Sequence, residues 1–291
     1  MAVSVIDLVK NINDVVSLPG VFVRVNTLVN DPQTPMTAVA AVISQDPGLT
    51  IRVLRMANSP AYGISKEIDS VSKAATIIGT ERIRDIALAT SAVETFDGIP
   101  NDLLSMEDFW MHSIYCAIIS KHLASKVKIA NTDSLFVAGL LHDIGQLVLF
   151  KAMPEESRKV LEYVLDDTEG TELHLVEQDI MGFDHAMVGG ALADSWQLTP
   201  MLVEIITSHH DLSHANKYKK ESAIVKIASS IAVMAELDTI NIDETDANPI
   251  TDYDWLNAGF DASQADSIMK QAVRNAQESY KEVQKLLMSD S

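Results

Sequence analysis

Cysteine and aromatic residues are scarce in this sequence. Its 291 residues include one cysteine, Cys116, and 5% aromatic residues. A single cysteine excludes a disulfide within the chain and a zinc site built from cysteines, and it fits a reducing, cytoplasmic location. Because the neighbours of Cys116 are apolar, we expect it to be a small core residue and not a nucleophile. The N-terminus has no basic start before an apolar stretch, so no signal peptide is expected.

Positive charge is also in short supply. The chain has 22 Lys and Arg against 41 Asp and Glu, which gives a net charge of −19. A chain this acidic repels nucleic-acid backbones, so DNA and RNA are not expected as partners. No apolar run reaches the roughly 18 residues typical of a membrane span, so no membrane partner is expected either. The acidic regions 155–172 and 236–254 are expected to be solvated faces or loops.

Apolar residues are plentiful, and their spacing is helical. They make up 47% of the chain, and no useful stretch shows the alternation typical of strands. We therefore predict an all-α protein. The best boundary is the stretch 97–101, which contains an Asp-Gly and a Pro-Asn pair. It divides the chain into a multi-helix part over 1–100, a second helical part over 101–237, and an acidic loop with a final helix over 238–291.

An adjacent His-Asp pair interrupts a long apolar run. His142 and Asp143 lie inside the stretch 135–150, where most other residues are apolar. Burying an ionised carboxylate there is costly unless the carboxylate is paired or binds a metal. A core histidine hydrogen-bonded to its neighbour would also explain the pattern. The pair alone therefore leaves both interpretations open.

The positions of the other histidines favour a metal site. All eight histidines follow the 97–101 boundary. Imidazole is the commonest metal ligand in proteins, and helical bundles build metal sites from side chains on separate helices. Five histidines lie near predicted helix ends or in partly apolar helices: His112, His142, His185, His209 and His210. His122, His174 and His214 lie among polar or charged residues, and we expect them to be ordinary hydrogen-bonded groups.

Two ordered sets of short motifs extend this pattern. The first set is Gln45-Asp46-Pro47-Gly48-Leu49-Thr50, Val53-Leu54-Arg55-Met56-Ala57-Asn58-Ser59, Ala61-Tyr62-Gly63, Ile68-Asp69-Ser70-Val71, Ala75 and Ile78-Gly79. The second set is Phe109-Trp110-x-His112-Ser113, Ala138-Gly139-Leu140-Leu141-His142-Asp143-Ile144-Gly145, Gly182-Phe183-Asp184-His185, Gly189, Ala191-Leu192, Trp196 and His209-His210. Together the two sets resemble the HDOD family, the HD-related output domain of bacterial signalling.

The resemblance implies both a fold and a site. The fold would be all-α, with a multi-helix N-terminal part packed on an HD-like helical bundle of the kind found in metal-dependent phosphohydrolases. The implied metal ligands are His112, His142, Asp143, His185, His209 and His210. In catalytic relatives such residues hold one or two divalent ions, which activate water and neutralise charge on a phosphate ester. The resemblance leaves the ion open among Fe, Mn, Ni and Mg.

Three departures from the catalytic pattern weaken the case for hydrolysis. Gln146 stands where cyclic-dinucleotide phosphodiesterases often have a lysine after the His-Asp motif. Ser229 follows Ala228 where the last core helix usually carries an aspartate ligand. The Gly-Tyr-Pro motif of the HD-GYP phosphodiesterases is absent from the sequence. If the site is active, Asp143 is the expected catalytic residue.

These observations leave three functions to compare. We expect a non-catalytic, cytoplasmic, bacterial signal-transduction module that acts through contacts with a signalling protein or by sensing a nucleotide or phosphate ligand. The alternative is a metal-dependent phosphohydrolase acting on a nucleotide or cyclic dinucleotide, which the six ligand-type residues support. A third possibility is a structural helical protein with a vestigial site. Whether the chain is an enzyme stays open at this point.

Overall fold

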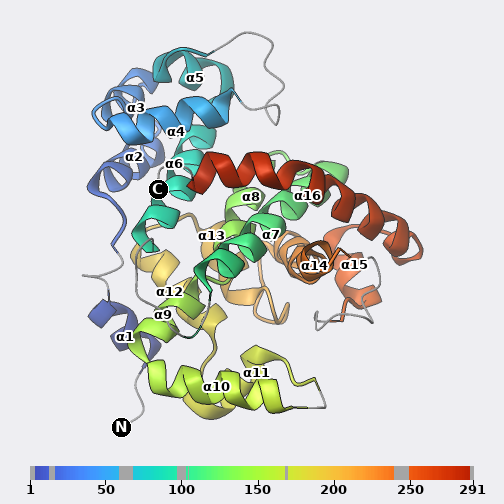
Figure 1. Ribbon diagram of the computed structural model, residues 1–291. Coiled ribbons are helices and arrows are strands. Elements are labelled where there is room, and N and C mark those ends of the chain that lie inside the picture. The colour runs from blue at the N-terminus through green and yellow to red at the C-terminus, as the bar shows by residue number, and fades with distance from the viewer. Residues whose placement is uncertain are drawn as a thin grey trace. The chain divides into compact units, whose positions relative to one another are not determined.

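The computed structural model describes residues 4–12, 17–58, 68–96, 103, 105–167, 170–238 and 249–288. All regular elements within these ranges are helices (Figure 1). The predicted all-α class is therefore confirmed. The chain divides into two compact units, one made of Met1–Val15 with Ile99–Lys281 and the other of Val16–Gly98 with Glu282–Ser291. The Asp-Gly and Pro-Asn pairs of the expected boundary lie outside the described residues.

The smaller unit is a set of short helices with a buried apolar face on each. Its helices are α2 (Gly20–Asn30), α3 (Met36–Ile43), α4 (Pro47–Ala57), α5 (Val71–Ile78) and α6 (Thr80–Phe96). Asp46 caps α4 by accepting a hydrogen bond from the Leu49 backbone N–H at 2.9 Å, with Pro47 in the first turn. Asn58 pairs with the backbone of Ile68 through two hydrogen bonds, at 2.7 and 2.8 Å. The Ala61-Tyr62-Gly63 motif lies outside the described residues.

The larger unit contains every histidine. Its helices are α1 (Val5–Ile12), α7 (Met106–Lys126), α8 (Thr132–Leu141), α9 (Ile144–Ala152), α10 (Pro154–Asp166), α11 (Leu173–Met181), α12 (His185–Ser195), α13 (Pro200–Ser208), α14 (Lys219–Glu236), α15 (Asp252–Ala258), the 3₁₀ helix η3 (Ala262–Gln264) and α16 (Ala265–Met288). Helices α7, α8 and α14 contact one another, and α12 packs between α9 and α13. The last residues of α16 fall in the smaller unit.

Helices near both ends of the chain belong to the larger unit. Helix α1 groups with the larger unit because it contacts α9 and α12 and buries Leu8, Val9 and Ile12. Near the other end, α15 begins within the last residues of the acidic stretch 236–254, which was expected to be a solvated face or loop, and continues to Ala258. A capping box between Thr251 and Asp254 starts this helix, and the buried Trp255 anchors it. Helix α15 packs against α14.

The expectation that no apolar run is long enough for a membrane span is corrected by one segment, which could cross a membrane by length and composition alone. It runs over Thr132–Ala152, and 78% of its most apolar window is buried inside the protein. It is also two helices rather than one, since α8 ends at Leu141 and α9 begins at Ile144. Core helices of water-soluble proteins pass the same test, so this segment is weak evidence for a membrane span.

Two glycines of the His-Asp motif allow helices to approach closely. A Cβ atom on Gly139 would lie 2.8 Å from the carbonyl oxygen of Cys116 on α7. A Cβ atom on Gly145 would overlap the carbonyl oxygen of His185 at the start of α12. Backbone atoms cannot yield as a flexible side chain can, so both positions require glycine. The motif thus brings α7 and α12 against the helices that carry the His-Asp pair.

Candidate metal centre

The six predicted ligands come from five helices, and most of them lie at helix ends. His112 is on the first third of α7, His142 follows α8, Asp143 precedes α9, His185 begins α12, and His209 and His210 follow α13. His142, Asp143, His185 and His209 are buried, while His112 and His210 are partly exposed. The structure brings all six side chains together. Their role as metal ligands stays a prediction.

Asp143 lies at the middle of this cluster. Its Oδ1 atom lies 3.2 Å from His185 Nε2 and 3.4 Å from His209 Nε2. Its Oδ2 atom lies 3.2 Å from His142 Nε2 and 3.8 Å from His112 Nε2. We call His112, His142 and Asp143 the first donor group, and Asp143, His185, His209 and His210 the second donor group. In each group the candidate ligand atoms all lie within 4.8 Å of one another.

The hydrogen bonds of His142 and His209 fix the tautomers that a metal requires. Nδ1 of His142 lies 2.8 Å from the Gly139 carbonyl oxygen, and Nδ1 of His209 lies 2.8 Å from the Ile206 carbonyl oxygen. A carbonyl only accepts, so each Nδ1 carries the proton and each Nε2 is left with a lone pair. Both Nε2 atoms are buried and have no hydrogen-bond partner among the described residues. Lone pairs that converge on a carboxylate fit a cation placed among them.

Two further carboxylates support the ligand histidines from behind. Glu177 Oε2 accepts from His185 Nδ1 at 2.6 Å and from the His185 backbone N–H at 2.8 Å. Glu236 Oε1 lies 2.7 Å from His112 Nδ1. A carboxylate on one ring nitrogen directs the other toward a metal and raises its basicity. Sequence analysis missed both glutamates, because charged residues in amphipathic helices ordinarily face solvent.

The electrostatics of the centre favour an ionised Asp143. Burial alone would raise the pKa of Asp143, but the charge of His142 and hydrogen bonds from His142, His185 and His209, which these rings supply when their Nε2 atoms are protonated, hold it well below its ordinary value. Burial would also lower the pKa of His185, but the Glu177 and Asp143 carboxylates raise it well above its ordinary value. These carboxylates therefore stabilise positive charge at the position where an ion would bind.

The pKa shifts of His112, His142 and His210 differ in direction. Burial opposes protonation of His112, yet Glu236 and then Asp143 raise its pKa. Burial is the main cause that lowers the pKa of His142. Burial and the neighbouring His209 and His185 hold the pKa of His210 well below its ordinary value. His142 and His210 are therefore neutral near pH 7, which is the form that binds a metal.

His174 is not the ordinary hydrogen-bonded residue that we expected. Its side chain is buried, and its ring stacks on His210 at a centroid distance of 4.2 Å. Within the part of the chain that the structure describes, its Nδ1 has no hydrogen-bond partner. Glu172 Oε2 lies 3.3 Å from that nitrogen. Burial, followed by the charge of His185, lowers the pKa of His174 to about 4. Glu172 and Glu177 drew attention away from this residue, although the flanking Leu173 and Leu175 were a local signal for a buried ring.

Ser229, which stands where the resemblance implies an aspartate ligand, lies close to the first donor group. Ser229 Oγ lies 3.4 Å from His112 Nε2. A hydroxyl therefore stands beside the ring nitrogen that points at Asp143, where the resemblance implies a carboxylate. His214, by contrast, is exposed and lies 3.9 Å from Asp211 Oδ2, in keeping with the expectation of an ordinary polar residue.

The fold and the cluster define an all-α protein with a buried His-Asp centre of the HD type. Residues 15–212 match the HDOD domain family, and the chain belongs to that family. An HDOD domain protein of unknown function from Geobacter sulfurreducens has a similar structure, with 25% sequence identity and a TM-score of 0.73 over 97% of this chain and 98% of that one.

Two other proteins are also similar. A structure from Shewanella amazonensis SB2B, described as a candidate phosphohydrolase, has 24% identity and a TM-score of 0.71 over 95% of this chain and 97% of that one. At this identity the likeness concerns the fold alone. An uncharacterized protein of Treponema pallidum (strain Nichols) is 25% identical over 231 residues, which are 79% of this chain. The chain spans 44% of the length of that relative.

Proposed function

We propose that this HDOD protein is a bacterial, cytoplasmic signalling module that acts through contacts with another signalling protein or by sensing a ligand. In this proposal its centre holds a divalent ion but hydrolyses phosphoesters slowly or not at all. The observation that carries the proposal is the position of Ser229. Its neutral hydroxyl faces His112 at 3.4 Å, where a catalytic centre needs a carboxylate.

The two donor groups differ in what they offer an ion. The second group supplies three imidazoles and the Asp143 carboxylate, a complete set for a tetrahedral or larger site. The first group supplies two imidazoles and shares Asp143. One ion would therefore be held more firmly than a second. A bound ion would supply positive charge that attracts phosphate-like anions, even though the chain carries a net charge of −19.

A metal-dependent phosphohydrolase is the second candidate function. The specific observation in its favour is that both donor groups share Asp143, with one carboxylate oxygen directed to each group. Bridging carboxylates hold the paired ions of many phosphoesterases. The Shewanella amazonensis structure described as a candidate phosphohydrolase has the same fold. In this alternative the substrate would be a nucleotide or a cyclic dinucleotide.

Metal content and turnover, measured together, test the proposal. Protein purified without added metal is expected to contain about one divalent ion per chain by mass spectrometry of the elements. It is expected to turn over bis(p-nitrophenyl) phosphate and cyclic dinucleotides no faster than the Asp143→Asn variant does. Brisk turnover that disappears in that variant would replace the signalling proposal with the enzyme. Absence of bound metal at any supplied concentration would contradict both candidates.

A further inference from the structure

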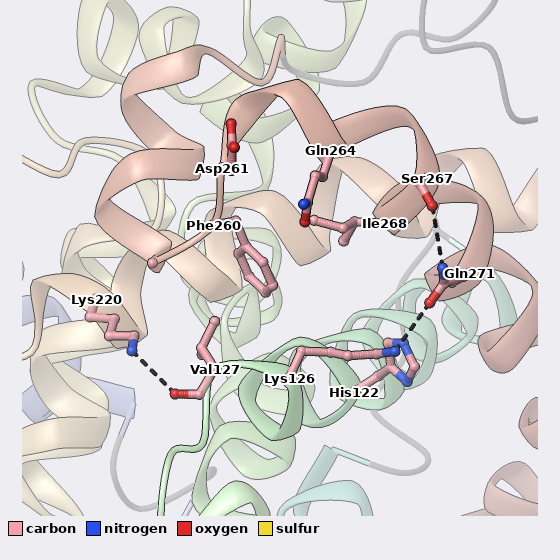
Figure 2. A pocket seen from close by; sticks show the side chains of 11 residues that line it. His122, Lys126, Val127, Lys220, Phe260, Asp261, Gln264, Ser267, Ile268 and Gln271 are labelled. Carbon is pink, nitrogen blue, oxygen red and sulfur yellow. Dashed lines mark hydrogen bonds between the residues drawn. The ribbon is translucent and has the colours of Figure 1, made fainter.

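A polar cavity lies in the larger unit and shares no residue with the metal centre. Its volume is about 680 Å³, and it lies between the ends of α7 and α14 and the stretch from Gly259 to Gln271 (Figure 2). Pockets that hold small organic ligands have volumes of roughly 300–1,000 Å³. The cavity is thus large enough for a small molecule, and its lining decides which kind.

Two lysines of the cavity bond neutral oxygens instead of carboxylates. Lys126 Nζ donates to Gln271 Oε1 at 3.1 Å, and Lys220 Nζ donates to the Val127 carbonyl oxygen at 3.4 Å. Neither lysine has an ion pair with a described carboxylate. The same two helices carry lysines that are paired, as Lys121 is with Asp133 at 2.7 Å and Lys226 with Asp254 at 3.1 Å. In a chain with almost twice as many acidic as basic residues, two uncompensated ammonium groups at one cavity favour an anion.

A histidine adds an unused polar atom beside these lysines. His122 Nε2 is buried and has no hydrogen-bond partner among the described residues. Burial, and then the charge of Lys126, lowers the pKa of this imidazole. The acidic residue of the lining, Asp261, is engaged elsewhere, since its Oδ1 accepts from the Ser263 backbone N–H at 3.0 Å. The lining therefore contains two lysine ammonium groups and an imidazole that can hold an anion. Its carboxylate, Asp261, already accepts a hydrogen bond from Ser263.

Figure 2 shows how these polar groups are separated. Lys220 lies at one end of the cavity, and Lys126 lies with His122 and Gln271 at the other. The Phe260 ring and the Ile268 side chain lie between the two ends. Burying an apolar group against such a wall contributes about 25 cal/mol per Å². A ligand that fits both features has a charged end and an apolar body.

We propose that this cavity binds a small organic anion. A carboxylate or phosphate group would be held by Lys126 and His122 or by Lys220, and the apolar body would lie against Phe260 and Ile268. The amide of Gln264 and the hydroxyl of Ser267 line the same cavity and would supply further hydrogen bonds. The site is separate from the metal centre, so it stands or falls independently of the proposed function.

The test uses the full chain and three probes: inorganic phosphate, phenyl phosphate and adipate. Binding is followed by NMR of the His122 imidazole, which is identified by its loss in a His122→Gln variant. This signal is local, so a probe that binds at the metal centre does not move it. We expect phenyl phosphate or adipate to shift the His122 signal at submillimolar concentration, and phosphate alone to bind at least about tenfold more weakly. Whichever organic probe binds tighter identifies the charged group.

Variants separate this site from general attraction of anions. The double variant Lys126→Gln and Lys220→Gln is expected to weaken binding on the order of tenfold or more. Gln264→Glu, a nearly isosteric change at an exposed position, is expected to weaken it as well. Lys270→Gln is the matched control, since Lys270 pairs with Asp266 at 2.8 Å and does not line the cavity. No shift by either organic probe, equal binding of inorganic phosphate, or unchanged binding in both pocket variants would overturn the proposal.

Discussion

Ser229 Oγ lies 3.4 Å from His112 Nε2, while Glu236 Oε1 lies 2.7 Å from the other nitrogen of the same ring. His112 is thus held from behind by a carboxylate and faced in front by a hydroxyl. The carboxylate of Glu236 therefore lies at Nδ1 of His112, away from the Nε2 atom that belongs to the first donor group. A neutral hydroxyl is a poor substitute for a carboxylate ligand, so under the proposed function Ser229 is the reason that a metal-binding centre would hydrolyse phosphoesters slowly or not at all.

Restoring a carboxylate at this position should strengthen the first donor group. In Ser229→Asp combined with Gln146→Lys, we expect metal content to rise from about one ion toward two. We expect hydrolysis of bis(p-nitrophenyl) phosphate to rise on the order of tenfold or more, because paired ions stabilise both the attacking and the leaving oxygen. Ser229→Asn is the matched control, since it has the same shape without the charge. Equal effects of the two substitutions would contradict this account.

The support of His185 by Glu177 gives a second prediction. Glu177 is buried and accepts from both the ring and the backbone of His185. Glu177→Gln keeps the size but removes the charge that raises the basicity of the ring. Substitution of such supporting groups typically costs about 10–100-fold in metal affinity, and we expect a loss in this range.

The control for Glu177→Gln is an exposed acidic residue on the same helix. Asp179→Asn changes the net charge equally at an exposed position of α11. Competition with a metal-sensitive dye measures both variants. A loss of affinity that is the same in the two would show that overall charge, and not the position of His185, is responsible.

Helical periodicity predicted the fold class, and the His-Asp motif with the other family motifs predicted the candidate site. The all-α class followed from apolar spacing, which is a local property of each helix. The six candidate ligands could be named because the ordered motifs resemble the HDOD family, and the positions of the five histidines near helix ends or in partly apolar helices agreed with that resemblance. Glu177 and Glu236 could not be recognised this way. Nothing local distinguishes a glutamate turned toward the centre from one turned toward water.

His174 and α15 are two further features that we did not predict from sequence. Glu172 and Glu177 made His174 look like an ordinary polar residue, although Leu173 and Leu175 flank it and its ring stacks on His210. The acidic stretch before Trp255 looked like a loop, although Thr251 and Asp254 form a capping box. The capping box is a local signal that sequence reading could have used, whereas the burial of the His174 ring and of Trp255 depends on tertiary packing, for Trp255 on that of α15 against α14. Local composition carries no information about such packing.

Gly145 gives a prediction about the backbone. A Cβ atom there would overlap the His185 carbonyl oxygen, so α9 and α12 would have to separate in Gly145→Ala. Since His185 begins α12, that separation would also displace its ring from Asp143. We expect the variant to lose about 2–4 kcal/mol of stability in urea denaturation, and to lose metal binding. Gly20→Ala is the control, because nothing lies within 4 Å of a Cβ atom there. A stable Gly145→Ala variant with normal metal content would contradict the close approach.

Removal of the metal should expose how much the centre contributes to stability. The buried Nε2 atoms of His142 and His209 have no hydrogen-bond partner in the described ranges, and they lie 3.2 and 3.4 Å from the Asp143 carboxylate. An ion would satisfy these acceptors, and it binds the folded chain far better than the unfolded one. At a concentration of 100 times its Kd it would add about 2.7 kcal/mol of stability. For a unit of this size that corresponds to a Tm change of roughly 5–10 °C.

We therefore expect a chelator to lower the Tm of the purified protein by about this amount, and added divalent metal to restore it. In Asp143→Asn the shared carboxylate of both donor groups is gone, so the chelator should change the Tm by less than about 1 °C. Asp133→Asn is the matched control, because Asp133 is also a buried carboxylate of the larger unit but pairs with Lys121. That variant should start from a lower Tm and keep the full response to the chelator. A chelator response that survives in Asp143→Asn would place the stabilising ion elsewhere in the protein, and the two donor groups would lose their main support.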